Sequence, residues 1–309
     1  MLWQHISLLV LMHASTAQLL VEMRNSEVWL IRGGQERQLT HDGKAKLQTI
    51  LSPAQNRVAY YEECPVAEHC KPAVVILDLE GHRIVSFEPK LQAVHPTETC
   101  ASILSIVWVG SHAIGAECHI NPSLSEYIET DISTGQTTKN LLGFGFVPSP
   151  DDRDVAHVGW IPHFAPPFAT SHYLQINSTT VYPLPKETGP VEQKDLSGPP
   201  KVFQEHGLTY SGIHEFASPF SWSPDSQRVA LIDCTYDWTA DSPMASSAGE
   251  RKESNRRCSL SVVSRKGEAS LLTLTDVSSN DSGPPRIFWT SPHQLTIRAH
   301  DVIKTLNVP

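Results

Sequence analysis

The sequence predicts an all-β protein, a β-propeller of four-stranded antiparallel blades, and three observations lead to this prediction. A short hairpin motif recurs along the chain, and further strand pairs joined by tight turns lie between its copies. No stretch of about 11 to 18 residues shows the apolar spacing of a helix. Without crossover helices the strands must pair as antiparallel neighbours, and four-stranded sheets repeated around an axis are the blades of a propeller.

The recurring motif is a strand, a tight turn that begins with Ser-Pro, and a second apolar strand. Proline presets the backbone of such a turn, and the apolar residues on either side mark the two strands of a hairpin. Three clear copies span 51–60, 148–157 and 222–231, and two degenerate copies span 108–114 and 289–297. Five copies predict five blades.

The two ends of the chain are predicted to complete one blade together. Residues 19–40 have the pattern of outer strands, while residues 286–308 have the pattern of inner strands. Pairing of the two segments would close the ring and tie both termini into the core. If each end instead belongs to a different blade, the count becomes six.

Two segments carry a more specific pattern. Trp-Ser-Pro-Asp at 222–225 is followed by Arg-Val-Ala at 228–230, and Val-Trp-Leu-Ile at 28–31 is followed by Gly-Gly at 33–34 and Arg-Gln-Leu-Thr at 37–40. These segments resemble the blade motif of the TolB-like, or WD40-like (PD40), propeller repeat family. The resemblance covers nearly all of the chain after residue 17. It implies an exported propeller that binds a protein or a peptidoglycan-associated partner.

This chain departs from the family pattern in the turn itself. The family usually has glycine after the turn aspartate, where this chain has Ser226 and Asp152. In the first copy, Ala54 replaces the aspartate.

The first seventeen residues predict a signal peptide. They contain no Asp, Glu, Lys or Arg, and an apolar run over 6–12 precedes the small residues Ser15, Thr16 and Ala17. We therefore expect cleavage after residue 17 and a single mature domain over 18–309. The apolar run is well short of the roughly 20 residues that span a bilayer, so no membrane insertion is expected after cleavage.

The cysteines agree with export, because disulfides persist in oxidising compartments. Six are present, and no two of them form a Cys-x-x-Cys pair. Hairpin topology brings each neighbouring pair to the same rim, which favours three pairs among the fifteen possible pairings. The predicted disulfides are Cys64–Cys70, Cys100–Cys118 and Cys234–Cys258. The predicted location is periplasmic or secreted.

Long connections are predicted at one end of the blades, the loop end, and short turns of about two to five residues at the other, the turn end. The long connections span 62–72, 88–99, 159–171, 183–218 and 235–257. Long loops on a rigid frame are where binding sites usually lie. The loop end carries all six cysteines and the candidate binding residues His41, His95, His206, His214, Glu215 and Phe216.

The predicted function is non-catalytic binding. No nucleophile elbow, zinc-protease helix, phosphate loop or dinucleotide-binding glycine pattern occurs, and the histidines have no fixed spacing for a metal, so neither metal nor cofactor is expected. The alternative is a carbohydrate-active hydrolase or lyase, because two carboxylates that flank a glycosidic bond suffice for hydrolysis. Its candidate acids at the loop-end mouth are Asp42, Glu98, Glu215 and Asp281.

The charge of the chain narrows the range of partners. The formal net charge is -9, and its scattered charges offer no basic face that could neutralise phosphates. Nucleic acid is therefore not an expected partner, whereas a protein or a cell-envelope component is. The mature domain is expected to be a monomer.

Overall fold

The computed structural model describes residues 19–64, 70–93, 96, 98–121, 124–159, 172–183, 208–240, 251–273, 285–299 and 302–308. The predicted signal peptide lies outside these residues. Within them every regular element is a strand and every pairing of named strands is antiparallel, which confirms the all-β prediction.

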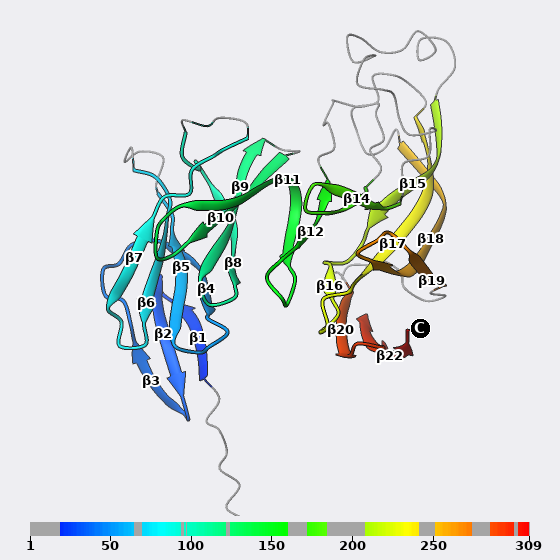
Figure 1. Ribbon diagram of the computed structural model, residues 1–309. Helices are drawn as coiled ribbons and strands as arrows, with labels where there is room; N and C mark the ends of the chain where they lie inside the picture. Colours follow the sequence, from blue (N-terminus) through cyan, green and yellow to red (C-terminus); the bar gives the residue numbers. More distant parts are fainter. Residues whose placement is uncertain are drawn as a thin grey trace, which may run out of the picture.

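The described strands form five hydrogen-bonded sheets (Figure 1), which we divide into six units in chain order by counting the seven-stranded sheet as two. Unit I consists of β1 (Leu19–Arg24), β2 (Glu27–Arg32) and β3 (Gln35–Gln38). Unit II consists of β4 (Lys46–Leu51), β5 (Arg57–Glu62), β6 (Ala73–Asp78) and β7 (Arg83–Phe87). Unit V consists of β15 (Leu208–Phe216), β16 (Ser221–Trp222), β17 (Arg228–Ala240), β18 (Arg251–Ser264) and β19 (Ala269–Thr273). Unit VI consists of β20 (Arg286–Ser291), β21 (Gln294–Ala299) and β22 (Val302–Asn307).

Units III and IV share one seven-stranded sheet, because a single long strand belongs to both. The sheet contains β8 (Ile103–Val109), β9 (Ala113–Asn121), β10 (Leu124–Asp131), β11 (Thr137–Pro148), β12 (Val155–Gly159), β13 (Leu174–Ile176) and β14 (Thr179–Tyr182). The first part of β11 pairs with β10 in unit III, and its second part pairs with β12 in unit IV. The change of partner occurs at Gly143, where an added Cβ would collide with the Val158 carbonyl oxygen.

The two ends of the chain do not share a blade, which corrects the prediction from the sequence. They form separate three-stranded sheets, units I and VI. The physical reason is that each end supplies three strands that pair with one another, β1–β3 and β20–β22, so neither segment takes a strand from the other. Tight turns close the hairpins of unit I. Asn25 and Ser26 have φ values of 51° and 62°, and Gly33 and Gly34 have 56° and 81°. Two consecutive residues with positive φ form the tight turn that suits a hairpin, so residues 19–38 pair among themselves.

Hydrophobic cores lie between consecutive units. Val28 of unit I packs with Val58 of unit II, and Ile76 of unit II packs with Trp108 of unit III. The same arrangement recurs along the chain, around Tyr127 and Phe146 for units III and IV, Leu174 and Leu231 for units IV and V, and Ile232 and Leu295 for units V and VI. Each sheet therefore buries apolar side chains against its neighbours in the sequence, as the blades of a propeller do.

A repeated hydrogen bond joins the inner strands, which we define as the first strand of each hairpin motif. Inner strands of successive units lie side by side, as β4 and β8 do, and β16 and β20. In three units the tryptophan near the end of the inner strand donates its indole N–H to a backbone carbonyl oxygen of the preceding inner strand. These bonds are Trp108 to Ile50 at 3.4 Å, Trp222 to Val147 at 2.9 Å and Trp289 to Ser221 at 2.9 Å.

The three clear Ser-Pro turns have the same internal bonding. In each, the buried serine hydroxyl accepts the backbone N–H of the residue five positions later, Arg57, Asp154 or Arg228. In each, the residue three positions after the serine has a positive φ, which is 53° at Gln55, 61° at Asp152 and 60° at Ser226. This is the left-handed region that favours glycine. The position at which the family usually has glycine is therefore strained in this chain.

Replacing Gln55 by glycine is expected to raise the free energy of unfolding by about 0.5–1 kcal/mol, because the left-handed backbone no longer carries a Cβ atom. Gln55 is exposed, so no packing is lost. Urea denaturation measures the change. The matched control is Ala54→Gly, one position earlier, which should lower stability by a similar amount because Ala54 does not have a positive φ. Destabilisation by Gln55→Gly would contradict the explanation.

Candidate functional site

A cleft of about 790 Å³ lies at the turn end, where the inner strands of four successive units reach their turns. Its walls are mainly apolar and aromatic. The lining residues include Ala54 of unit II, Trp108 and Gly110 of unit III, Pro148 and Asp152 of unit IV, and Phe220 and Trp222 of unit V. The sequence predicted a binding surface at the loop end, whereas this cleft lies at the opposite end, where short turns surround the inner strands.

The two tryptophans of the cleft are fixed in place. Both indole N–H groups are used in the bonds to the preceding inner strands, and both side chains are largely buried. The guanidinium of Arg265 lies 5.6 Å from the ring centre of Trp222. The walls of the cleft are therefore rigid aromatic surfaces whose polar atoms are already bonded.

Asp152 is the one ionisable residue among those that line the cleft. It is half-buried, and it lies against the turn between β8 and β9, where an added Cβ on Gly110 would collide with its Oδ2 atom. Among the described residues, no hydrogen bond or ion pair involves the Asp152 carboxylate. The cleft thus carries one carboxylate whose charge is not paired.

A second group of polar residues lies in unit V and centres on the carboxylate of Asp233, which is 1% exposed. Its Oδ2 atom accepts hydrogen bonds from His214 Nδ1 at 2.7 Å and from the Tyr182 hydroxyl of unit IV at 2.8 Å. The Ser261 hydroxyl in turn lies 3.2 Å from the Tyr182 hydroxyl. Burial and then the charge of Asp233 raise the pKa of Tyr182, so the hydroxyl keeps its proton and donates.

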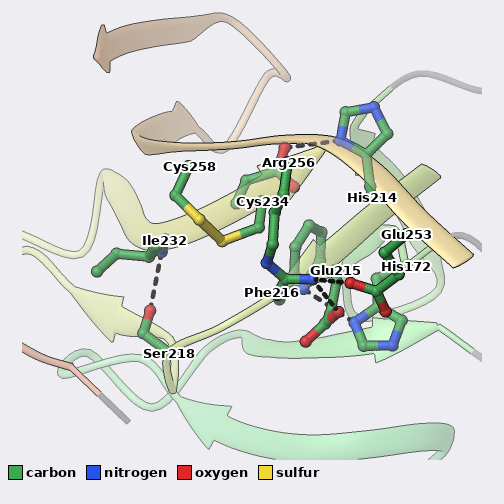
Figure 2. Close-up of a disulfide and its surroundings, with 11 residues drawn as sticks. His172, His214, Glu215, Phe216, Ser218, Ile232, Cys234, Glu253, Arg256 and Cys258 are labelled. Atoms are coloured by element: carbon green, nitrogen blue, oxygen red, sulfur yellow. Dashed lines mark hydrogen bonds and ion pairs between the residues drawn. A yellow bond between two sulfur atoms is a disulfide. The ribbon is translucent and has the colours of Figure 1, made fainter. Parts of the chain in front are cut away.

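Side chains next to this group are also bound to one another (Figure 2). Arg256 lies 3.1 Å from a carboxylate oxygen of Glu215 and 3.1 Å from one of Glu253. The backbone N–H of Phe216 donates to Nδ1 of His172 at 3.0 Å. Burial lowers the pKa of His172, which keeps the ring neutral and lets this nitrogen accept. Together, the contacts of these side chains and of the Asp233 group connect the strands β14, β15, β17 and β18.

The predicted site residues that the structure describes lie in three separate places. His214, Glu215 and Phe216 lie together on β15 and make the internal contacts just described. His41 and Asp42 lie in the connection from β3 to β4, where the Asp42 carboxylate contacts Lys46 and accepts the backbone N–H of Lys44 at 3.1 Å. Glu98 precedes β8, and its carbonyl oxygen accepts the N–H of Leu91. His95, His206 and Asp281 lie outside the described residues.

The six cysteines form three disulfides in the structure, Cys64–Cys70, Cys100–Cys118 and Cys234–Cys258. These are the pairs that hairpin topology favoured. Cys234 and Cys258 face each other directly on the neighbouring strands β17 and β18. Cys234 directly follows Asp233 in the sequence, and the disulfide lies near His214 and Arg256 (Figure 2).

Sequence reasoning missed several members of these sites. Asp233, Tyr182, His172 and Arg256 were not singled out, although one signal was available. Asp233 is a lone carboxylate within the apolar run 229–234, and a buried charge in such a run needs partners.

Among the described residues, no group of three His, Cys, Asp or Glu side chains could hold a metal ion. The same part of the chain has no helix long and apolar enough to span a membrane.

No protein-family model matches the chain, and no curated protein matches it. Solved structures do resemble it at low identity. TolB from Acinetobacter baumannii is 14% identical with a TM-score of 0.39, over 94% of this chain and 61% of that one. The β-propeller domain of the Trilobed protease from Pyrococcus furiosus is 10% identical with a TM-score of 0.43, over 94% and 81%. Tricorn protease is 9% identical with a TM-score of 0.43, over 94% and 32%. The chain spans less than two thirds of TolB and of tricorn protease.

Proposed function

We propose that this chain is an exported, non-catalytic scaffold that binds an extended ligand in the cleft at its turn end. The cleft itself supports this most, because a hollow with rigid aromatic walls and few polar groups is typical of binding sites. Its lining comes from four units, which suits an elongated ligand such as a peptide segment. Three disulfides agree with an oxidising compartment.

Hydrolysis of a carbohydrate receives less support. Such a reaction uses two carboxylates on either side of the bond that is cleaved. The cleft offers Asp152 alone, and Asp42 and Glu215 are bound to basic side chains in different parts of the fold. His214, Glu215 and Phe216, the predicted binding residues at the loop end, are bound within unit V. The cleft is therefore the better-supported place for a ligand.

Replacing Ala54 by tryptophan is expected to abolish ligand binding. Ala54 is exposed in its turn and lines the cleft, so an indole there fills the ligand's space without disturbing a core. Peptides selected on the wild-type protein from a random phage-displayed dodecapeptide library provide the probes. Fluorescence anisotropy should show that they bind Ala54→Trp about tenfold or more weakly, a loss of about 1.4 kcal/mol.

The matched control is Gln35→Trp, which places the same side chain at an exposed position on β3 outside the cleft. This variant should bind the selected peptides as the wild type does. Failure of the library to yield any binding peptide would contradict the proposal. Equal binding by wild type and Ala54→Trp would show that the cleft is not the site.

A further inference from the structure

We propose that the cleft selects a peptide segment that places a lysine or arginine side chain against Asp152. This inference rests on the proposed function, since it names the chemistry of the ligand that the cleft would take. Asp152 is the one charged residue of the lining, and its carboxylate has no partner among the described residues. A cationic group of a ligand would supply that partner.

Arg265, whose guanidinium lies over Trp222 of the cleft, is already occupied. Arg265 makes two contacts with the Asp151 carboxylate, at 2.9 and 3.0 Å, and one with Asp154 at 2.9 Å. The two aspartates on either side of Asp152 therefore share this guanidinium. His112 approaches the same glycine turn that Asp152 contacts, but among the described residues no hydrogen bond or ion pair joins these two side chains. The negative charge of Asp152 thus remains available to a ligand.

Comparison of the three Ser-Pro turns shows that Asp152 is not needed to build its turn. Gln55 and Ser226 occupy the equivalent position with the same left-handed backbone. Ser226 has an internal role, because its hydroxyl accepts the N–H of Asp151 at 3.0 Å, whereas the Asp152 carboxylate makes no such bond. Aspartate is one of the few residues other than glycine that tolerate this conformation, so the backbone neither requires nor forbids it at position 152.

The apolar lining of the cleft suits the apolar stem of a lysine or arginine side chain. Lysine and arginine carry apolar stems, which pack on apolar surfaces while the charged head stays at a polar group. Trp108, Phe220 and Pro148 supply such surfaces around Asp152. The net charge of -9 also attracts cations to the protein over longer distances. Because four units contribute to the lining, an extended peptide fits the cleft better than a compact small cation.

The test removes the charge of Asp152 and keeps its shape. Asp152→Asn should fold, because asparagine tolerates the left-handed region better than most residues, and Asp152→Gly provides a second variant without strain. The peptides selected on the wild type should be enriched in lysine and arginine relative to the library. Both variants should bind them about fivefold or more weakly at low ionic strength, as expected for loss of one partly buried ion pair.

Two controls separate the possible outcomes. Glu80→Gln changes the net charge equally at an exposed turn outside the cleft and should leave binding unchanged. Replacing the lysine of a selected peptide by norleucine should weaken binding to the wild type but not to Asp152→Asn. If both Asp152 variants bind as the wild type does while Ala54→Trp does not, this inference is overturned and the proposed function stands. If Ala54→Trp also binds normally, the proposed function fails with it.

Discussion

Replacing Asp233 by alanine is expected to lower the free energy of unfolding by about 3 kcal/mol, because it removes the buried carboxylate that accepts hydrogen bonds from two half-buried donors. The donors are His214 Nδ1 and the Tyr182 hydroxyl, at 2.7 and 2.8 Å from the same carboxylate oxygen. Tyr182 belongs to unit IV and Asp233 to unit V, so the substitution also weakens the junction between these units. Urea denaturation followed by tryptophan fluorescence measures the loss.

Tyr182→Phe is the matched control for the Asp233 group. It removes one of the two donors and should cost about 1 kcal/mol. The double variant should be less destabilised than the sum of the two single variants, because both changes remove the same hydrogen bond. A loss below about 0.5 kcal/mol in Asp233→Ala, the size typical of a surface substitution, would contradict the structural role of this carboxylate.

Removing the Cys234–Cys258 disulfide is expected to lower the free energy of unfolding by about 3–4 kcal/mol, because the unfolded chain gains the freedom of a long loop. The two cysteines are 24 residues apart in the sequence, and Cys234 is fully buried. The variant Cys234→Ala with Cys258→Ala keeps both positions small and uncharged. The urea concentration at which this variant is half unfolded should be clearly lower than that of the oxidised wild type.

The Cys64–Cys70 disulfide supplies the comparison, since its cysteines are only 6 residues apart. Removal of this pair by two alanines should cost about 2 kcal/mol, because closing a short loop restricts the unfolded chain less. The order of the two effects is the decisive result. A larger loss from the Cys64 pair than from the Cys234 pair would show that loop closure is not the source of the stabilisation.

The hairpins and the cysteine pairs could be predicted from the sequence because both involve residues that are close together along the chain. A Ser-Pro turn fixes the two strands on either side of it, and the topology of one hairpin places Cys100 near Cys118. The separation of the two terminal sheets was missed because the pattern of residues 19–40 and 286–308 shows that each end forms hairpins, but not whether the two sets of strands pair with each other.

The cleft and the Asp233 group were missed for a different reason. Both are assembled from several units, and the sequence does not show which side chains of different units face one another. Asp152 could be recognised as a departure from the family's glycine, but its position against Gly110 of the neighbouring unit appears only in three dimensions. Tyr182 and Asp233 are 51 residues apart and meet across the junction of units IV and V.

The shared strand β11 makes one junction of this protein unlike the other four. At the other junctions, side chains pack against one another and the strands of the two units belong to different hydrogen-bonded sheets. At β11 one continuous strand pairs first with β10 of unit III and then with β12 of unit IV, with an irregularity between Phe144 and Val147. Local opening of a protein proceeds in roughly contiguous cooperative blocks that often coincide with supersecondary motifs. We therefore expect units III and IV, which share a strand, to open together rather than one at a time.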